Sequence, residues 1–440
     1  MNIAVIGTGY VGLVTGACFS EFGVQVTCVD ADAEKIEGLV RGNIPIYEPG
    51  LEELVTRNAQ SGRLAFSTDT GEAVQSALVI FIAVGTPALE DGGTDLRFIE
   101  AVARDIGRNL SEYKVVVTKS TVPAGTAEAV RGWIEEELEA AGKGGQPFSV
   151  ASNPEFLREG AAIGDFMRPD RVVIGVDPSD EQARAILKDL YRPLYLNETP
   201  FVITDIPTAE LSKYAANAFL ATKISFINEL SILCETIGGD VQAVARVMGL
   251  DRRIGSKFLH AGPGFGGSCF PKDTASVAHF ARESGTAFEI VEAAMRVNQR
   301  QRERMVEKIA AAFSGDLEGR TIAVLGLAFK PETDDIRDAP AIAIIRGLRA
   351  RGAEVRCFDP VAMPAAEAVF SDVTFAKDAY AACEGADALV LVTEWNEFRA
   401  LDLVRVRGLL REPILIDLRN VYNADVVASA GLRYRSVGRQ

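Results

Sequence analysis

The sequence predicts an α/β fold made of two doubly wound, Rossmann-like domains joined by a long central helix. Three observations lead to this fold class. A β-branched apolar run at residues 3–6 leads directly into a glycine-rich turn, and a similar run at residues 321–326 starts a second alternation of strand and helix patterns. Residues 207–237 have the periodicity of one long helix with few interior breakers. We expect an N-terminal domain at 1–205, a central helical domain at 206–313 and a C-terminal domain at 314–440.

Composition and charge argue against several function classes. The chain has 440 residues and a formal net charge of −15, which disfavours nucleic acid or an anionic membrane as the main partner. Its 6 cysteines lie far apart without a C-x-x-C pair, so we expect neither a zinc site nor a disulfide framework. The longest apolar run, residues 77–84, is too short to span a bilayer, and the chain starts with a strand pattern rather than a signal peptide. These features favour a cytoplasmic protein.

The first glycine-rich turn is typical of dinucleotide binding. Residues 7–12 read Gly-Thr-Gly-Tyr-Val-Gly, and a helix pattern at 14–22 and a second strand at 24–29 follow. This order of strand, glycines, helix and strand makes the fingerprint specific. Gly7 permits the tight turn, Gly9 lets the backbone approach a pyrophosphate, and Gly12 lets the helix pack on the strand. The helix N-terminus would attract the phosphates.

Asp30 ends the second strand and extends the fingerprint. An acid at this place accepts hydrogen bonds from the adenosine ribose hydroxyls, and its charge repels a 2′-phosphate. The alternative is a solvated loop acid. In this context the residue favours NAD over NADP.

Later turns in the first half lie where open α/β sheets bind ligands. Thr86 follows the strand at 77–84, Thr121 follows the strand at 115–118, and Glu155 follows the strand at 148–151. The acids of the last turn fit equally well as helix N-terminal caps. On the long helix, Lys213 and Asn217 are one turn apart and share a face. For an arbitrary helix a solvated lysine would be the default, but the neighbours of Lys213 are mainly apolar.

One cysteine lies in a turn suited to nucleophilic chemistry. Residues 264–273 read Gly-Phe-Gly-Gly-Ser-Cys-Phe-Pro-Lys-Asp and place Cys269 beside Lys272 and Asp273. A thiol reacts as the thiolate, which an ammonium group, backbone N–H groups or a helix N-terminus stabilise. The alternative is a small buried cysteine at a tight turn. Together with a dinucleotide fingerprint, this turn predicts an oxidation through a covalent sulfur intermediate.

The C-terminal half repeats the strand pattern without the full fingerprint. The turn at residues 326–330 lacks the remaining glycines, so we expect no second dinucleotide bound in the same way. Lys330, Arg337 and Arg419 place cations near predicted strand ends, which suits a nucleotide-linked or phosphorylated substrate. Each of them taken alone would be read as a surface cation.

These motifs together resemble the UDP-glucose/GDP-mannose dehydrogenase family along the whole chain. Residues 91–97 depart mildly from the family's usual loop. The matching segments, in family order, are residues 7–12, 85–87, 120–123, 153–160, 210–214 with Asn217, 253–255, 264–273 and 329–337.

The resemblance implies a four-electron oxidation in which a nucleotide sugar's primary alcohol becomes a carboxylate and two NAD are reduced. Cys269 would add to an aldehyde intermediate, and water would cleave the resulting thioester. Lys213 and Asn217 would stabilise an oxyanion, while proton transfer would involve the acids and Thr121 with a water. UDP-glucose is favoured over GDP-mannose as the substrate. An obligate homodimer, or a higher oligomer built from dimers, through the central helical domain is also implied.

The resemblance also assigns site residues. For catalysis these are Cys269, Lys213, Asn217, Asp273, Thr121 and Glu155. For NAD they are Gly7, Gly9, Tyr10, Val11, Gly12, Asp30, Lys35, Thr86, Thr121, Glu159, Lys272 and Arg337. For the nucleotide sugar they are Glu155, Phe156, Leu157, Arg158, Glu159, Lys213, Asn217, Phe258, Leu259, His260, Gly264, Phe265, Gly266, Phe329, Lys330 and Arg419, with Arg253 reaching the sugar from a neighbouring subunit.

Two other function classes stay open at this point. One is a catalytically silent nucleotide-sugar sensor that retains both folds, although the cysteine, lysine, asparagine and aspartate are all present. The other is a two-electron dehydrogenase in which Cys269 is structural. UDP-N-acetylmannosamine dehydrogenases are a more distant match. The NADH yield per sugar separates the main alternatives, because it would be two, one or none.

Overall fold

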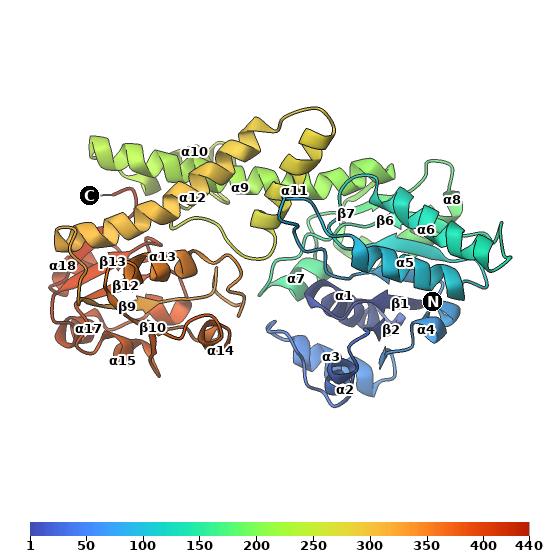
Figure 1. The fold of residues 1–440 in the computed structure, drawn as a ribbon, viewed down its shortest axis with the longest axis horizontal. Helices are drawn as coiled ribbons and strands as arrows, with labels where there is room; N and C mark the ends of the chain where they lie inside the picture. Colours follow the sequence, from blue (N-terminus) through green and yellow to red (C-terminus); the bar gives the residue numbers. More distant parts are fainter. Residues whose placement is uncertain (440) are drawn as a thin grey trace. The chain divides into compact units, whose positions relative to one another are not determined.

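The computed structural model describes residues 1–439. The chain folds into two compact units that divide between Ala216 and Asn217. Each unit contains one sheet with helices on its faces (Figure 1).

The sheet of the first unit has eight strands in the order β3-β2-β1-β4-β5-β6-β7-β8. Its pairings are parallel except that β6 and β7 pair antiparallel. The strands are β1 Asn2–Ile6, β2 Gln25–Val29, β3 Leu64–Ser67, β4 Val79–Ile82, β5 Val115–Thr118, β6 Ser149–Ser152, β7 Val172–Gly175 and β8 Phe201–Thr204.

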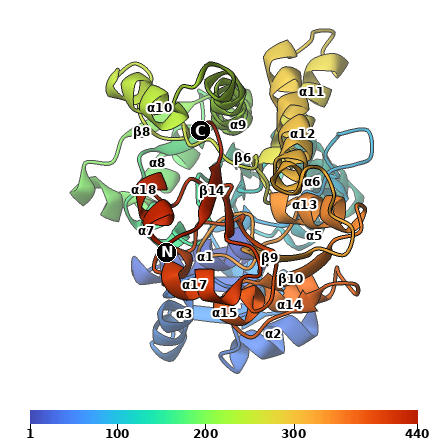
Figure 2. The ribbon, with the colours of Figure 1, turned by 90° about the vertical axis from the view of Figure 1, so that its left-hand side faces the viewer.

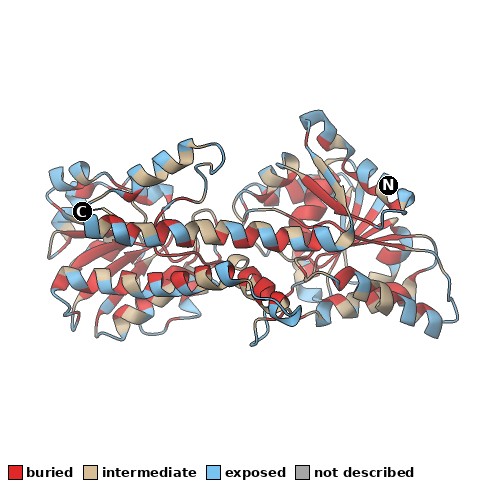
Figure 3. Cartoon of the chain, turned by 90° about the horizontal axis from the view of Figure 1, so that it is seen from above, coloured by how far each residue is buried: buried red, intermediate tan, exposed pale blue. Residues whose placement is uncertain are grey.

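Helices cover both faces of this sheet, so its central strands are buried (Figure 3). One face packs with α1, α3 and α7, and the other packs with α4, α5 and α6. Burial on both faces explains why β4 and β5 consist almost entirely of apolar residues. The helices are α1 Tyr10–Glu21, α2 Ala33–Val40, α3 Leu51–Gln60, α4 Thr70–Ser76, α5 Arg97–Asn109, α6 Thr126–Ala140, α7 Ala162–Met167, α8 Glu181–Leu190 and the short 3₁₀ helix η1 Arg192–Asn197.

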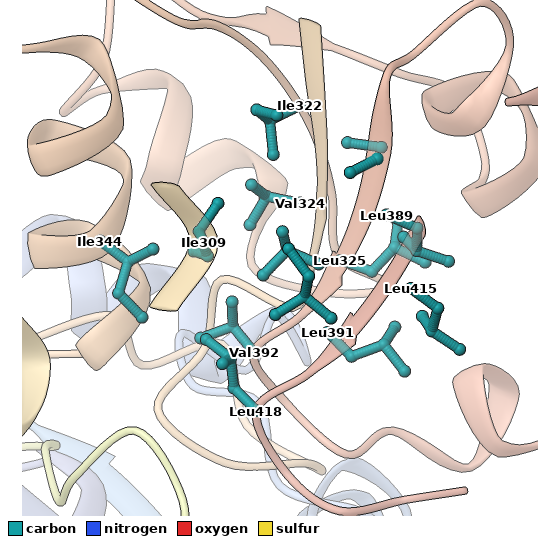
Figure 4. Packing of buried hydrophobic residues seen from close by; sticks show 14 of the residues in the cluster. Ile309, Ile322, Val324, Leu325, Ile344, Leu389, Leu391, Val392, Leu415 and Leu418 are labelled. Carbon is teal, nitrogen blue, oxygen red and sulfur yellow. The ribbon is translucent and has the colours of Figure 1, made fainter. Parts of the chain in front are cut away.

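The second unit contains a parallel sheet of six strands in the order β11-β10-β9-β12-β13-β14. Its core joins β9, β12 and β13 to Ile309 of α12 and Ile344 of α13 (Figure 4). At the sheet edge, α18 packs beside β14 (Figure 2). The strands are β9 Thr321–Leu325, β10 Glu354–Phe358, β11 Thr374–Phe375, β12 Ala388–Leu391, β13 Ile414–Asp417 and β14 Arg433–Ser436. The helices are α10 Val241–Leu250, α11 Phe270–Glu283, α12 Glu289–Ala310, η2 Ala311–Phe313, α13 Pro340–Arg349, α14 Met363–Glu367, α15 Ala379–Cys383, α16 Asn396–Arg399, α17 Leu403–Leu409 and α18 Ala424–Ser429.

The long helix α9, Ile206–Ile237, begins in the first unit and ends in the second. Two Rossmann-like units and this helix confirm the predicted fold class. Helix α1 begins at Tyr10, earlier than the helix pattern suggests, because the extended backbone of Gly9 ends the turn there.

Three features of the described chain bear on its chemistry. Within residues 1–439, no helix combines the length and the apolarity that crossing a membrane requires. Over the same range, no group of three or more His, Cys, Asp or Glu side chains is placed to hold a metal ion. The 6 cysteines form no disulfide.

Candidate active site

The glycines of the first turn have distinct steric roles. Gly7 has a φ of +104°, and a Cβ atom there would lie 2.5 Å from the Ala83 carbonyl oxygen. A Cβ at Gly12 would lie 1.9 Å from the Gly7 oxygen, so turn and helix can pack only with glycine at this position. A Cβ at Gly9 would meet nothing within 4 Å. Gly9 therefore leaves open space at the N-terminus of α1, which fits the pyrophosphate of NAD.

Asp30 lies at the carboxyl end of β2 and faces this turn. Its Oδ2 accepts hydrogen bonds from the Thr8 backbone N–H at 2.8 Å, the Thr8 hydroxyl at 2.7 Å and Lys35 Nζ at 2.9 Å. Partial burial opposes ionisation, but the Thr8 and Lys35 donors outweigh it and lower the pKa of Asp30 to about 2. The other oxygen accepts from the Asp32 N–H, at 3.2 Å. This ionised carboxylate keeps acceptor capacity for ribose hydroxyls.

Glu48, which no sequence motif marks, connects the N-terminus of α1 to the loop at residues 153–160. The Tyr10 hydroxyl donates to its carboxylate. The backbone N–H groups of Gly160 and Ala162 donate to the same carboxylate at 2.6 and 2.8 Å. Burial and the Glu48 carboxylate both raise the pKa of Tyr10, so the hydroxyl stays protonated. The contacts hold the loop that contains Glu159 against the N-terminus of α1, where Tyr10 and Val11 lie.

The turns after β4 and β5 are also tied together. The Thr86 hydroxyl donates to the Thr121 carbonyl at 3.0 Å. Glu210, which lies on α9 and is 2% exposed, accepts from the N–H groups of Gly125 and Ala127 at 2.7 and 2.9 Å. The start of α6 is thereby anchored to the helix that carries Lys213.

A buried ion pair lies in the first unit. Lys213 Nζ is 2.9 Å from Glu155 Oε1, and the two residues are 3% and 6% exposed. The Leu157 N–H donates to the other Glu155 oxygen at 2.5 Å. Burial opposes ionisation of Glu155, but the charge and hydrogen bond of Lys213, followed by the Leu157 N–H, lower its pKa below the usual range. The pair therefore places a carboxylate and an ammonium group side by side in the protein interior.

Aromatic and charged neighbours hold the same loop. Lys213 Nζ lies 5.4 Å from the centroid of the Phe156 ring, and the Arg171 guanidinium carbon lies 3.6 Å from it. Arg158 pairs with Asp165 at 2.5 Å on the exposed side of the loop. The structure therefore brings Glu155, Phe156 and Lys213 together, whereas Arg158 faces solvent.

In the second unit, Cys269 is the N-cap residue of α11. The Asp273 N–H donates to its carbonyl at 2.8 Å, and the Ser268 hydroxyl lies 3.6 Å from its Sγ. Within residues 1–439, it is the one cysteine that is partly exposed, since the other five are buried. Burial raises the pKa of Cys28, Cys357 and Cys383 to about 12. A partly exposed thiol at a helix N-terminus is the environment that favours a reactive thiolate.

Asp273 lies one turn after Cys269 and is 0% exposed. Its Oδ2 accepts from Asn217 Nδ2 at 2.6 Å, and its Oδ1 accepts from Lys272 Nζ at 2.6 Å. Asn217 lies one turn after Lys213 on α9. The second unit therefore places a neutral amide and an ammonium group on one buried carboxylate, close in sequence to the thiol.

The glycine-rich loop before Cys269 packs against two elements of the second unit. Asn298 of α12 exchanges hydrogen bonds with the Phe265 backbone at 2.8 and 3.0 Å. A Cβ at Gly266 would lie 2.3 Å from the Asp338 oxygen, and Gly264 has a φ of +108°. Only glycine fits these two places, so the loop is held close to the turn that follows β9.

Arg419 completes this region. Its Nε donates to the Val392 oxygen at 2.7 Å, its Nη2 donates to the Phe329 oxygen at 3.0 Å, and it pairs with Glu394 at 3.1 Å. A fixed guanidinium at the carboxyl end of a parallel sheet suits a diphosphate.

The remaining predicted site residues each make few contacts that bear on the site. Phe258 adopts a φ of 64° and packs on Phe270, with ring centroids 6.0 Å apart. Leu259 is buried and His260 is exposed. Arg253 pairs with Asp251 at 2.6 Å while 89% of its side chain is exposed. Arg337 pairs with Asp335 at 2.8 Å, and Lys330 lies 5.5 Å from the Phe329 ring centroid.

Comparisons with known proteins agree with this organisation. Residues 1–195 match the NAD binding domain of the UDP-glucose/GDP-mannose dehydrogenase family, residues 207–300 its central domain and residues 323–424 its UDP binding domain. The chain is 54% identical to the UDP-glucose 6-dehydrogenase of Rhizobium meliloti (strain 1021), with 100% of both chains covered. It is 48% identical to UDP-glucose 6-dehydrogenase TuaD of Bacillus subtilis (strain 168), with 100% of this chain and 93% of that protein covered.

A solved structure extends the comparison to three dimensions. The UDP-glucose dehydrogenase of Pyrobaculum islandicum superimposes with a TM-score of 0.91 at 42% identity, covering 100% of this chain and 98% of that one. The match extends over both Rossmann-like units. The chain therefore belongs to the UDP-glucose/GDP-mannose dehydrogenase family of NAD-dependent oxidoreductases, and NAD is its cofactor.

Proposed function

We propose that the protein oxidises UDP-glucose to UDP-glucuronate in a four-electron reaction that passes through a thioester on Cys269. The observation that carries this proposal is the partly exposed thiol at the N-terminus of α11, one turn before a buried aspartate that Asn217 and Lys272 contact. The names of the full-length relatives support the choice of sugar nucleotide.

The proposed oxidation passes through an aldehyde, a thiohemiacetal and a thioester. The primary alcohol loses one hydride and one proton to give an aldehyde. The Cys269 thiol adds across the aldehyde carbonyl and forms a thiohemiacetal, which loses a second hydride and proton to give a thioester. Water then cleaves the carbon–sulfur bond, which releases the carboxylate and restores the thiol. NAD, when bound, accepts the hydride that each oxidation removes.

The residues of the chain have separate roles in this proposal. The Lys213 ammonium and the Asn217 amide stabilise negative charge on the sugar oxygen, a contribution whose loss typically costs about 3–4 kcal/mol. Glu155 and Asp273, with Thr121 and a water, move protons. Covalent attachment to Cys269 keeps the aldehyde from escaping between the two oxidations.

Substrate and cofactor positions follow from the same assignment. The loop at residues 258–266, with Phe329, Lys330 and Arg419, holds the UDP group, because it combines glycines for close approach with cations for the diphosphate. Lys272 and Arg337 are assigned to NAD. The division into segments 1–205, 206–313 and 314–440 separates cofactor binding, dimerisation with the cysteine turn, and UDP binding.

The NADH yield tests this function. We expect two NADH per UDP-glucose when the sugar is limiting. A yield of one would reassign Cys269 to a structural role, and no turnover on any nucleotide sugar would favour a sensor. Turnover on GDP-mannose but not on UDP-glucose would keep the mechanism and change the substrate.

We also propose that the protein is a homodimer, or an assembly of dimers, through the central segment. Phe219, Phe226 and Leu233 recur at seven-residue spacing on α9 and are 66%, 49% and 53% exposed. Val247 and Leu250 on α10 are 72% and 77% exposed. Such an apolar helix face is typical of a subunit interface. We expect Phe226→Asp to lower the mass measured by light scattering to that of a monomer. A cytoplasmic location stays a prediction of the sequence.

A further inference from the structure

A buried lysine that the proposed mechanism does not use lies at the carboxyl end of β5. Lys119 is 4% exposed. Its Nζ donates to Asn153 Oδ1 at 2.9 Å and to Tyr191 Oη at 3.2 Å. Both acceptors are neutral, and within residues 1–439 this lysine forms no ion pair. Burying a cation without a carboxylate contact lowers the stability of the folded protein, which suggests that Lys119 has a role other than stabilising the fold.

The partners of Lys119 connect it to two turns of the candidate site. Tyr191 Oη donates to Asn153 Oδ1 at 2.5 Å, and Asn153 Nδ2 donates to a carbonyl of β7 at 2.7 Å. Asn153 and Tyr191 are 1% and 3% exposed, so water does not compete for these bonds. Lys119 precedes Thr121 by two residues, and Asn153 precedes Glu155 by two. The network therefore fixes the starts of both turns relative to each other.

The charge of Lys119 acts on the Glu155–Lys213 pair. Burial lowers the pKa of Lys119 to about 7, while the Glu155 carboxylate opposes this shift and the Lys213 ammonium adds to it. In return, the Lys119 ammonium contributes to lowering the pKa of Glu155. The other groups that face Lys119 Nζ are the rings of Phe166 and Tyr191, whose centroids lie 6.0 and 5.9 Å away. Glu155 and Lys213 are thus the charged groups that respond when Lys119 gains or loses its proton.

We propose that Lys119 is a positioning residue for the oxidation: it holds the Thr121 and Glu155 turns through Asn153 and Tyr191, and its charge sets how readily the Glu155 carboxylate takes up a proton. This inference rests on the proposed function for the role of Glu155. When Lys119 is protonated, Glu155 is a weaker base. When Lys119 releases its proton to solvent, Glu155 becomes a stronger base, and proton removal from the substrate becomes easier.

The pH profile of kcat tests this role. We expect kcat of the wild-type enzyme to rise with an inflection near pH 7, and we expect Lys119→Met to lack that inflection. The matched control is Lys114→Met at the amino end of the same strand. Lys114 is also buried, at 3% exposure, and donates to the Gln75 carbonyl. It lies about 16 Å from Lys119, because a strand rises about 3.3 Å per residue. The control should keep the wild-type profile.

Tyr191→Phe provides a second variant that keeps the ring and removes one acceptor of the ammonium group. With one acceptor fewer, the charged form of Lys119 is less stable, so the inflection should move to lower pH. This variant decides the question if Lys119→Met fails to fold. An inflection that persists in Lys119→Met, or that does not move in Tyr191→Phe, would overturn the proposal.

A titration that does not need turnover separates this inference from the proposed function. The protein labelled with ¹³C at the lysine ε-carbon should show one resonance that titrates near pH 7 and is absent from Lys119→Met. If the protein does not oxidise UDP-glucose, the proposed function fails while this resonance still reports on the charge of Lys119. If every lysine resonance titrates only above pH 9, Lys119 stays charged and the inference fails.

Discussion

The two sheets have the same central strand order, but the acid that follows the second strand differs between them in its hydrogen bonding. Asp30 follows β2 in the first unit and Asp359 follows β10 in the second. Asp359 is 1% exposed, and its two oxygens accept hydrogen bonds from five N–H groups. The donors are the backbone N–H groups of Leu327, Ala328, Val361 and Ala362 and the indole N–H of Trp395. The acceptor capacity that Asp30 offers to a ribose is used inside the protein at Asp359.

The glycine-rich turns after β1 and β9 also differ in whether they leave room for a dinucleotide. Gly326 has a φ of +96°, and a Cβ there would lie 2.4 Å from the side chain of Thr393, so the first glycine of the turn is retained. Ala328 takes the place of the second glycine, and the next helix, α13, begins only at Pro340. One Rossmann-like sheet is therefore open at its glycine turn for a dinucleotide, and the other is closed by its own side chains.

The largest effect that we expect from this comparison is at Gly12. A Cβ 1.9 Å from a backbone oxygen cannot be accommodated without moving the turn. We expect Gly12→Ala to raise the KM for NAD by more than about 100-fold, corresponding to more than about 2.7 kcal/mol. The matched control is Gly132→Ala within α6, where a Cβ meets nothing within 4 Å. It should leave the KM unchanged and stabilise the fold by about 0.5–1 kcal/mol. Equal KM values for the two variants would contradict the steric account.

The second prediction exchanges the two acids for amides. Asp30→Asn should raise the KM for NAD about 10-fold or more, because it weakens charged hydrogen bonds to the cofactor. It should lower the free energy of unfolding less than Asp359→Asn does, because the Asp30 carboxylate is partly exposed. Asp359→Asn should leave the KM for NAD unchanged and lower the free energy of unfolding by more than about 2 kcal/mol, because an amide N–H₂ would face buried backbone N–H groups. Steady-state kinetics and urea unfolding measure the two effects. The comparison fails if Asp359→Asn weakens NAD binding more than Asp30→Asn does.

Local sequence patterns predicted the parts of the fold that both sheets share. The apolar run at residues 115–118 coincides with β5, since a strand buried on both faces has no polar alternation to confuse its limits. The strands β3, β7, β8, β11 and β14 were not predicted. β14 is an edge strand with the polar sequence Arg-Tyr-Arg-Ser, so an apolar pattern is missing there.

The candidate site could be predicted only in part, because its contacts join buried residues that are far apart in the sequence. The sequence predicted Glu155 and Lys213 separately, but it did not predict that they pair. Lys119 directly follows an apolar strand, and a lysine in that position was a signal that could have drawn attention to it. Its neutral partners, Asn153 after β6 and Tyr191 after α8, lie far along the chain, and no local pattern encodes such a network.

The smallest expected effect concerns how each sheet holds the turn after a central strand. In the second unit Asp417, at the end of β13 itself, accepts from the Tyr422 N–H at 2.9 Å. In the first unit Glu210 holds the turn after β5 from α9, and burial raises its pKa to about 7 against the lowering effect of the Ala127 and Gly125 N–H groups. Because the folded protein keeps a proton on Glu210 that the unfolded chain has lost above about pH 4.3, its contribution to stability falls as the pH rises from there to 7.

Urea unfolding at pH 5 and pH 8 measures this pH dependence. The stability of Glu210→Gln relative to the wild type should improve from pH 5 to pH 8, since the variant cannot ionise at this position. Glu128→Gln, which changes an exposed acid on α6, is the control and should show no such trend. A stability of Glu210→Gln relative to the wild type that falls or stays constant from pH 5 to pH 8 would contradict the raised pKa.

The reaction of the Cys269→Ser variant with UDP-glucose and NAD tests the central claim most directly. Formation of UDP-glucuronate, followed by chromatography, should fall by at least about 1,000-fold, because a residue that forms the covalent intermediate cannot be replaced by its neighbours. Cys234→Ser, at a buried cysteine in the second unit, is the control and should retain turnover. Wild-type rates of acid formation in Cys269→Ser would contradict the thioester mechanism.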